Sequence, residues 1–291
     1  MTHILTLIAN RAATTLDDPT IARVRDAVRG GTLDILSPGE AADIQLATSP
    51  DMALVRAVLG NKPIDAITVK ARGRRKGLLI ADMDSTIITS ETLDEMAAYA
   101  GLKEKISAIT ARAMNNELNF EEALRERLAM LKGLSLDALA KTWARTELTP
   151  GARELVATMR AHNAMTALVS GGFTYFTSRV TSLLGFDTHR ANILLDDGVA
   201  LLGAVSEPIL GRDAKVAALK EMAAQRKLKM SATLAVGDGA NDLAMLAQAG
   251  LGVAFRAKPA VAAAARARVD HADLRALLFA QGYRVADIRA A

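Results

Sequence analysis

Two aspartates, Asp82 and Asp84, follow a short apolar run at residues 78–81. Such a run predicts a strand buried on both faces, and side chains two apart on an extended backbone point the same way. Both carboxylates can therefore bind the same ligand. Buried charges are costly unless a cation compensates them, and ligation by oxygen alone favours magnesium. The alternative at this point is a turn with two solvated acids.

A second group of polar side chains follows another apolar run. Residues 234–236 precede Gly237, and then come Asp238, Asn241 and Asp242. Two more acids and an amide therefore stand at a second expected strand end. The glycine allows the backbone to approach a ligand closely.

A hydroxyl and a lysine complete the set. The apolar run 164–169 ends in Ser170 and Gly171, which offer a hydroxyl and an unobstructed backbone N–H suited to phosphate oxygens. Lys215 lies between this site and the second acidic group in the sequence. Ligands of open parallel sheets bind outside the carboxyl ends of the strands, so we expect these groups to converge there.

The order of these motifs resembles that of the haloacid dehalogenase superfamily. Within that superfamily, residues 76–275 are similar to the phosphoserine phosphatases, whereas the N-terminal portion is not part of the resemblance. The superfamily motifs are Asp82-x-Asp84-x-Thr86, Ser170, Lys215 and Gly237-Asp238 followed by Asp242. The closer match adds Glu91, Asn119-Phe120, Arg125-Glu126-Arg127, Leu131-Lys132-Gly133-Leu134 and Val169-Ser170-Gly171-Gly172-Phe173.

The resemblance implies a Mg²⁺-dependent phosphomonoester hydrolase. It would convert O-phospho-L-serine to L-serine and phosphate, the last step of serine synthesis, through a phosphoaspartyl intermediate. Asp82 would be the nucleophile and Asp84 the general acid and base. The metal would be held by Asp82, Asp238 and the backbone carbonyl of Asp84. The residues with supporting roles around phosphate and metal would be Ser170, Gly171, Lys215, Asn241, Asp242 and Thr86.

Recognition of free phosphoserine requires an acid for its ammonium and preferably an arginine for its carboxylate. Glu91 and Arg127 fit these roles by their places in the family pattern, with Met114 and Phe120 as apolar walls. Taken singly, each residue has a simpler interpretation as a helix charge or a core side chain. The sequence match to the phosphoserine phosphatases around Arg127 favours its role in a phosphoserine pocket.

Composition sets limits on the protein class. A chain of 291 residues suits roughly two domains, and 51% hydrophobic residues suffice for sizeable cores. The net charge of +4 would help to attract an anionic substrate and does not indicate nucleic acid. Zero cysteines exclude disulfides and thiolate chemistry. No apolar run is long enough to span a membrane, and the first 15 residues do not resemble a secretion signal, so we expect a cytoplasmic protein.

The expected fold is α/β, with a doubly wound parallel sheet like that of the haloacid dehalogenase superfamily. The catalytic domain spans residues 76–291, and a helical cap at about 92–149 is inserted after its first strand. Residues 1–71 alternate as β-α-β-β-α-β, which predicts a small ferredoxin-like module that resembles ACT-type regulatory domains. A regulatory role and a packing or homodimerisation role are both open for this module.

Other segments are expected to be structural. The basic stretch at residues 72–77 lacks interleaved aromatics and predicts a solvated linker. Asp196-Asp197-Gly198 predicts the turn of an antiparallel flap at one edge of the sheet. Residues 260–268 and 272–280 are expected to form terminal helices.

The sequence is also compatible with two alternative functions. The active site could transfer the phosphoryl group from phosphoserine to another small alcohol, because the motif residues do not distinguish water from a competing hydroxyl. The protein could also act chiefly as an amino-acid-responsive regulator through residues 1–70.

Overall fold

Strand β5 (Leu78–Ala81) lies at the centre of a six-stranded sheet in the computed structural model, which describes residues 2–114 and 117–290. The strand order is β12-β11-β10-β5-β6-β7, and all five pairings are parallel. The predicted parallel α/β sheet is therefore confirmed. The other strands of this sheet are β6 (Met165–Phe173), β7 (Thr188–Asn192), β10 (Thr233–Gly237), β11 (Leu251–Phe255) and β12 (Ala267–Val269).

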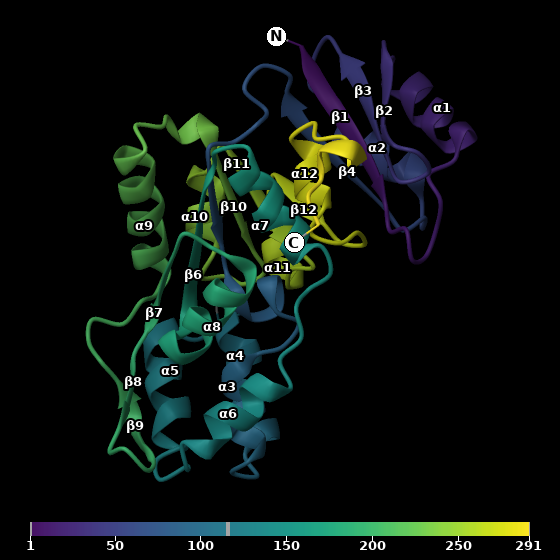
Figure 1. The fold of residues 1–291 in the computed structure, drawn as a ribbon. Helices are drawn as coiled ribbons and strands as arrows, with labels where there is room; N and C mark the ends of the chain where they lie inside the picture. Colours follow the sequence, from purple (N-terminus) through teal and green to yellow (C-terminus); the bar gives the residue numbers. More distant parts are fainter. Residues whose placement is uncertain (1, 115–116, 291) are drawn as a thin grey trace.

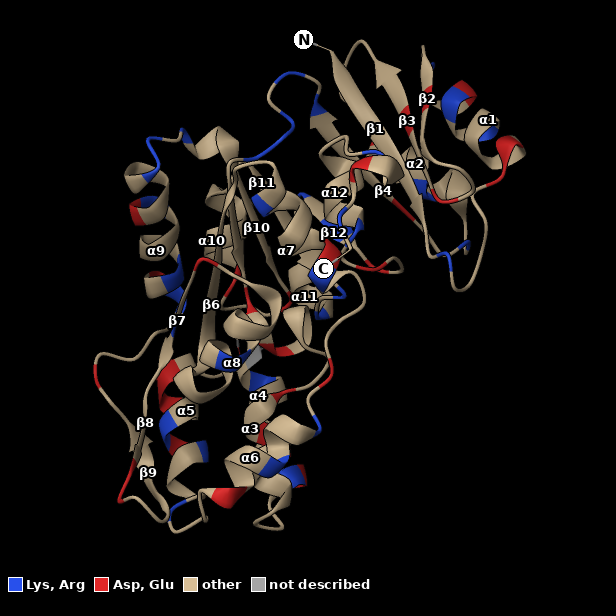
Figure 2. Ribbon diagram, viewed as in Figure 1, with Lys and Arg blue, Asp and Glu red and all other residues tan. Residues whose placement is uncertain are grey.

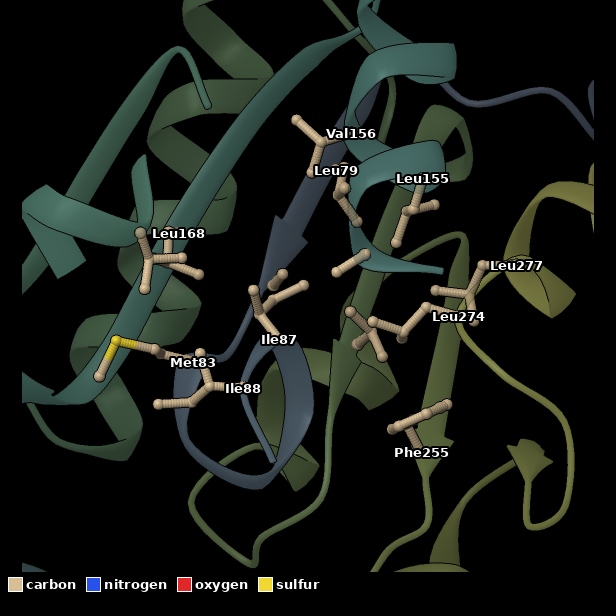
Figure 3. Packing of buried hydrophobic residues seen from close by; sticks show 14 of the residues in the cluster. Leu79, Met83, Ile87, Ile88, Leu155, Val156, Leu168, Phe255, Leu274 and Leu277 are labelled. Atoms are coloured by element: carbon tan, nitrogen blue, oxygen red, sulfur yellow. The ribbon is translucent and has the colours of Figure 1, made fainter. Parts of the chain in front are cut away.

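Helices cover both faces of this sheet, which explains why its strands are continuously apolar. Alternate residues of β5 belong to two different apolar clusters, one with Leu79 and one with Ile80. Figure 3 shows part of the first cluster, where side chains of β5, β6, α7 and the segment at Leu274 and Leu277 point toward one another. The helices are α7 (Ala152–Ala161), α8 (Thr174–Leu184), α9 (Arg212–Gln225), α10 (Leu243–Gln248), α11 (Pro259–Ala264) and α12 (Ala276–Ala280).

The N-terminal module has its own antiparallel sheet, with the order β2-β3-β1-β4. Asp17 and Asp51 accept backbone hydrogen bonds at the starts of its two helices, as N-cap residues do. The predicted β-α-β-β-α-β order is confirmed. The elements are β1 (His3–Ala9), α1 (Asp18–Ala27), β2 (Leu33–Ser37), β3 (Ala41–Leu46), α2 (Met52–Leu59) and β4 (Ile64–Lys70).

The predicted helical cap is also confirmed, and it follows the first strand of the parallel sheet. Its two connections to the core run side by side, since Ile88 and Leu148 form an antiparallel bridge and Thr149 N–H donates to the carbonyl of Ile87. Figure 1 shows the cap and the N-terminal module at opposite ends of the molecule. The cap helices are α3 (Thr92–Ala98), α4 (Lys103–Met114), α5 (Phe120–Ala129) and α6 (Asp137–Ala144).

The predicted antiparallel flap forms a small sheet of its own. Strands β8 (Leu194–Asp196) and β9 (Leu201–Val205) pair around the turn and follow the edge strand β7. Strand β9 lies against α5 of the cap. The flap therefore extends the edge of the core toward the cap.

The prediction of two long terminal helices is wrong in part. Helix α11 ends at Ala264, and the next residues form β12, which pairs with β11 at the edge of the sheet. Pairing with an existing strand overrides the helical propensity of this alanine-rich segment. Helix α12 begins only at Ala276, because Asp65 of the module holds the residues that precede it.

The module is attached to the core through buried polar contacts, and part of the linker takes part in them. The carboxylate of Asp65 accepts backbone N–H bonds from Asp270, His271 and Ala272. The guanidinium of Arg74 pairs with Asp43.

The prediction of a solvated linker is therefore wrong for Arg74. It is also wrong for Lys76, whose ammonium donates to the carbonyls of Gly73 and Ser231. Figure 2 shows the basic residues of the linker in blue, where it runs from β4 to the parallel sheet.

None of the helices in the described part of the chain combines the length and the apolar character that a membrane crossing requires.

We expect Asp65→Ala to destabilise the protein by about 3 kcal/mol, because three backbone N–H groups would lose a charged acceptor at a buried position. The free energy of unfolding from urea titration measures this loss. Asp26→Ala is the matched control, because the Asp26 side chain is 76% exposed and should change stability by no more than about 0.5 kcal/mol. Equal stability of the two variants would contradict the role given to Asp65.

Candidate active site

The strand order brings the predicted polar residues to one place. Strand β5 lies between β10 and β6, so the residue after β5, Asp82, is flanked by Asp238 after β10 and by Ser170 near the end of β6. All three residues are at least 95% buried. The carboxyl edge of the sheet therefore carries the site, as expected for an open parallel sheet.

Lys215 holds two of the acids together. It lies in the first turn of α9, and its ammonium Nζ is 2.8 Å from Oδ1 of Asp82 and 2.7 Å from Oδ1 of Asp242. Burial lowers the pKa of Lys215, but the two carboxylates outweigh burial and raise this pKa above its usual value. The side chain is therefore a permanent cation at 0% exposure.

Three carboxylates cluster here, and two of them contact the ammonium. Oxygens of Asp82, Asp238 and Asp242 all lie within 4.8 Å of one another. Burial, followed by the charge of Asp82, raises the pKa of Asp242 to about 7, although contact with Lys215 opposes the shift. Burial, followed by the charge of Glu91, raises the pKa of Asp238 well above its ordinary value. The site therefore holds three acids for one contacting ammonium.

One oxygen of this cluster is ready to accept a ligand. Within the described residues, Oδ2 of Asp238 is buried without a hydrogen-bond partner, and the nearest cation recorded for it is the ammonium of Lys258 at 3.9 Å. A buried, unsatisfied carboxylate oxygen is unfavourable unless a ligand compensates it. Together with Asp82 and Asp242 it offers the all-oxygen environment that hard divalent cations prefer.

The chain turns sharply after β5 and thereby places Asp84. Strand β5 ends at Ala81, and Asp84 keeps an extended backbone (φ −64°, ψ 137°) inside an irregular turn in which Ser85 has φ 53°. Oδ1 of Asp84 accepts a bond from the N–H of Thr92 at the start of the cap. Burial, and next the charge of Glu91, raises the pKa of Asp84 well above its ordinary value, which favours the protonated form.

Thr86 lies at the end of the same turn. Its hydroxyl is 3.5 Å from Oδ1 of Asp238, so it joins the turn after β5 to the acids after β10.

The end of β6 leaves its backbone open to the site. Gly172 N–H donates to the hydroxyl of Ser170, and Asn192 donates to the carbonyl of Gly171. A Cβ at residue 171 would lie 2.6 Å from Cζ of Phe120, and one at residue 172 would lie 2.6 Å from Oδ2 of Asp84. Glycine is required at both positions because the cap and the acid approach so closely.

The cap supplies the remaining predicted residues. Glu91, Phe120 and Arg127 line a cavity of about 30 Å³ together with Asp82 and Ser170. This volume holds one or two water molecules, so the cap leaves little space over the acids. Asp84, Gly171, Asp238 and Asn241 line the same cavity. The side chain of Met114 lies outside the described part of the structure.

Arg127 is held in place inside the cap. It is 3% exposed, and its guanidinium donates to the carbonyl of Ala123 and to the hydroxyl of Thr110. The same hydroxyl donates to the carboxylate of Asp94. Burial lowers the pKa of Arg127, and the charge of Asp94 opposes this shift.

Glu91 is held in a similar way. Its carboxylate accepts a 2.6 Å bond from the hydroxyl of Ser85. Burial raises the pKa of Glu91, whereas the bond from Ser85 lowers it.

The sequence patterns did not reveal several residues that support the site. Thr110 and Asp94 lie on different cap helices, so only the packing of α3 against α4 brings them together. Asn192 is the last residue of the edge strand β7 and belongs to none of the sequence motifs. Lys258 lies in the loop between β11 and α11. Only this position near a strand end could have indicated from the sequence that Lys258 lies close to Asp238.

Comparisons with known proteins agree with this geometry. A family model described as haloacid dehalogenase-like hydrolase matches residues 79–247. The chain is 44% identical over 200 residues to a protein named phosphoserine phosphatase from Streptococcus thermophilus, which covers 68% of this chain and 93% of that protein.

Two solved structures are also similar. A phosphoserine phosphatase described as a phospho-aspartyl intermediate analogue is 38% identical with a TM-score of 0.67, covering 70% of this chain and 98% of that one. A HAD family hydrolase from Salmonella enterica serovar Typhi is 28% identical with a TM-score of 0.85, covering 97% of this chain and 98% of that one. The chain belongs to the haloacid dehalogenase-like hydrolase family.

Proposed function

We propose that this protein hydrolyses O-phospho-L-serine to L-serine and phosphate through a phosphoaspartyl intermediate at Asp82. The observation that carries the proposal is the buried contact of Asp82 with Lys215, together with the cavity that Asp82 lines with Arg127 and Glu91. The contact of Asp82 with Lys215 suits phosphoryl transfer. Arg127 and Glu91 suit recognition of the carboxylate and the ammonium of an amino acid. Names of relatives at about 40% identity support the same substrate.

Magnesium is the metal that the acidic cluster fits. The unsatisfied Oδ2 of Asp238 and its nearness to Asp82 agree with an oxygen-ligated dication, and the backbone carbonyl of Asp84 would complete the set that the family resemblance implies. When bound, the ion would neutralise charge on the phosphate and the attacking carboxylate.

The attack itself depends on charge and position. Lys215 holds one oxygen of Asp82, and the other forms a bond to phosphorus as the bond from phosphorus to the serine oxygen breaks. The hydroxyl of Ser170 and the N–H of Gly171 would donate to the transferring oxygens. Closure of the cap over the bound substrate would keep bulk water from the reacting groups.

Asp84 would move the protons. Its raised pKa keeps a proton on the carboxyl group, which it gives to the departing serine oxygen. It then accepts a proton from the water that attacks the phosphoaspartate, so phosphate leaves and Asp82 is restored. The bond from Thr92 N–H fixes one oxygen and leaves the other for this exchange.

The cap would recognise the amino-acid part of the substrate. Arg127 and Glu91 line the cavity, where Arg127 would pair with the carboxylate and Glu91 with the ammonium. Phe120 closes the cavity beside Gly171 as an apolar wall. A cavity of about 30 Å³ is too small for phosphoserine, so the cap must open to admit the substrate.

We further propose that residues 1–71 form a regulatory or dimerisation module, that residues 76–291 form the catalytic domain, and that residues 92–149 form its cap. The polar contacts of Asp65 with the C-terminal segment support a module that is docked on the core rather than freely tethered. A homodimer through this module remains a prediction.

Asp82→Asn should reduce phosphate release from L-phosphoserine by at least about a thousandfold, because the amide is a poor nucleophile. The assay follows phosphate release with magnesium and with a chelator, and we expect the chelator to abolish wild-type turnover. Asp18→Asn, an exposed change in the N-terminal module, is the control and should keep full activity. Comparable turnover by Asp82→Asn would remove the proposed nucleophile.

Thr110→Val should raise the KM for L-phosphoserine about tenfold with a smaller change in kcat, because Arg127 loses the hydroxyl that fixes it. O-Phosphoethanolamine lacks the carboxylate, so its kinetics should change little. Thr110→Ser keeps the hydroxyl and should restore the wild-type KM. An equal rise in KM for L-phosphoserine and O-phosphoethanolamine would contradict the assignment of Arg127 to the carboxylate.

A further inference from the structure

A second, larger cavity lies between the N-terminal module and the catalytic sheet. Its volume is about 640 Å³, which is in the usual range for sites of small molecules. The end of β4 and the linker form one wall, and the beginnings of β11 and β12 form the other. Since the active-site acids follow the carboxyl ends of the parallel strands, this cavity lies at the opposite edge of the sheet.

The lining of this cavity is basic. Among the described residues that line it there is no aspartate or glutamate, whereas Lys70, Arg72, Lys76 and Arg266 contribute positive charge. Lys76 already donates two hydrogen bonds to backbone carbonyls. No ion pair is recorded for Lys70, Arg72 or Arg266 within residues 2–114 and 117–290. Their charges are therefore available to an anionic ligand.

Apolar side chains complete the walls. Met52, Leu246 and Leu251 line the cavity along with the basic residues. An inorganic ion would leave this surface uncovered, whereas an organic anion would contact it. The combination of basic side chains and an apolar wall favours a ligand with both an anionic and an apolar part.

We infer that this cavity binds a small organic anion, a phosphate or carboxylate of about the size of a nucleoside monophosphate. Lys70, Arg72 and Arg266 bind its anionic oxygens. The site is separate from the proposed active site and does not depend on the proposed function. A ligand there contacts both the module and the parallel sheet.

Isothermal titration of the full-length protein tests this inference with three probes, AMP, citrate and adenosine. We expect AMP or citrate to bind, and the preferred one distinguishes a phosphate ligand from a carboxylate ligand. Adenosine should bind at least tenfold more weakly than AMP. The Lys70→Glu/Arg266→Glu variant should weaken binding of the preferred anion at least tenfold.

The control is Lys105→Glu/Lys141→Glu, which makes the same change in net charge at two exposed positions of the cap. It should bind the anion with wild-type affinity. If AMP bound in the active site instead, the cavity variant and the control would bind it with equal affinity. That result would overturn the inference. Failure of both anions to bind at about 1 mM, or equal binding of AMP and adenosine, would also overturn it.

Discussion

The contact between one buried lysine and two aspartates is the constraint on which the rest of this structure depends. An ammonium without exposure is stable only when carboxylates pair with it, and Lys215 has Asp82 on one side and Asp242 on the other. With Asp238 nearby, three acids share one internal cation. This excess of acids over cations suits a divalent metal, which would offset the repulsion between the attacking carboxylate and an anionic phosphate.

The larger elements can be understood as the means of holding that cluster. Parallel pairing on both sides of β5 sets three strand ends side by side, and α9 brings the lysine to them from the adjacent layer. The cap then closes a cavity over the acids and adds a cation that is itself fixed by hydrogen bonds within the cap. At the far end, buried polar contacts join the N-terminal module to the last strand and helix of the core.

Sequence reasoning predicted the parts of the site that follow from strand ends. Apolar runs that lead into Asp82, Ser170 and Asp238 were sufficient, because parallel topology places such ends together. It did not predict the contact of Thr110 with Asp94, which depends on how two cap helices pack. Strand β12 was missed because its composition favours a helix and only pairing with β11 makes it a strand. The buried linker residues were missed because their acceptors lie far away in the sequence.

The central claim is that the carboxylate of Asp82, activated within the lysine cluster, takes the phosphoryl group. Rapid quenching of the enzyme during turnover of ³²P-labelled L-phosphoserine, followed by borohydride reduction and peptide sequencing, tests it directly. We expect acid-stable, hydroxylamine-sensitive label on the protein and homoserine at position 82 after reduction. Label on a different residue, or turnover without any protein-bound phosphate, would contradict the claim.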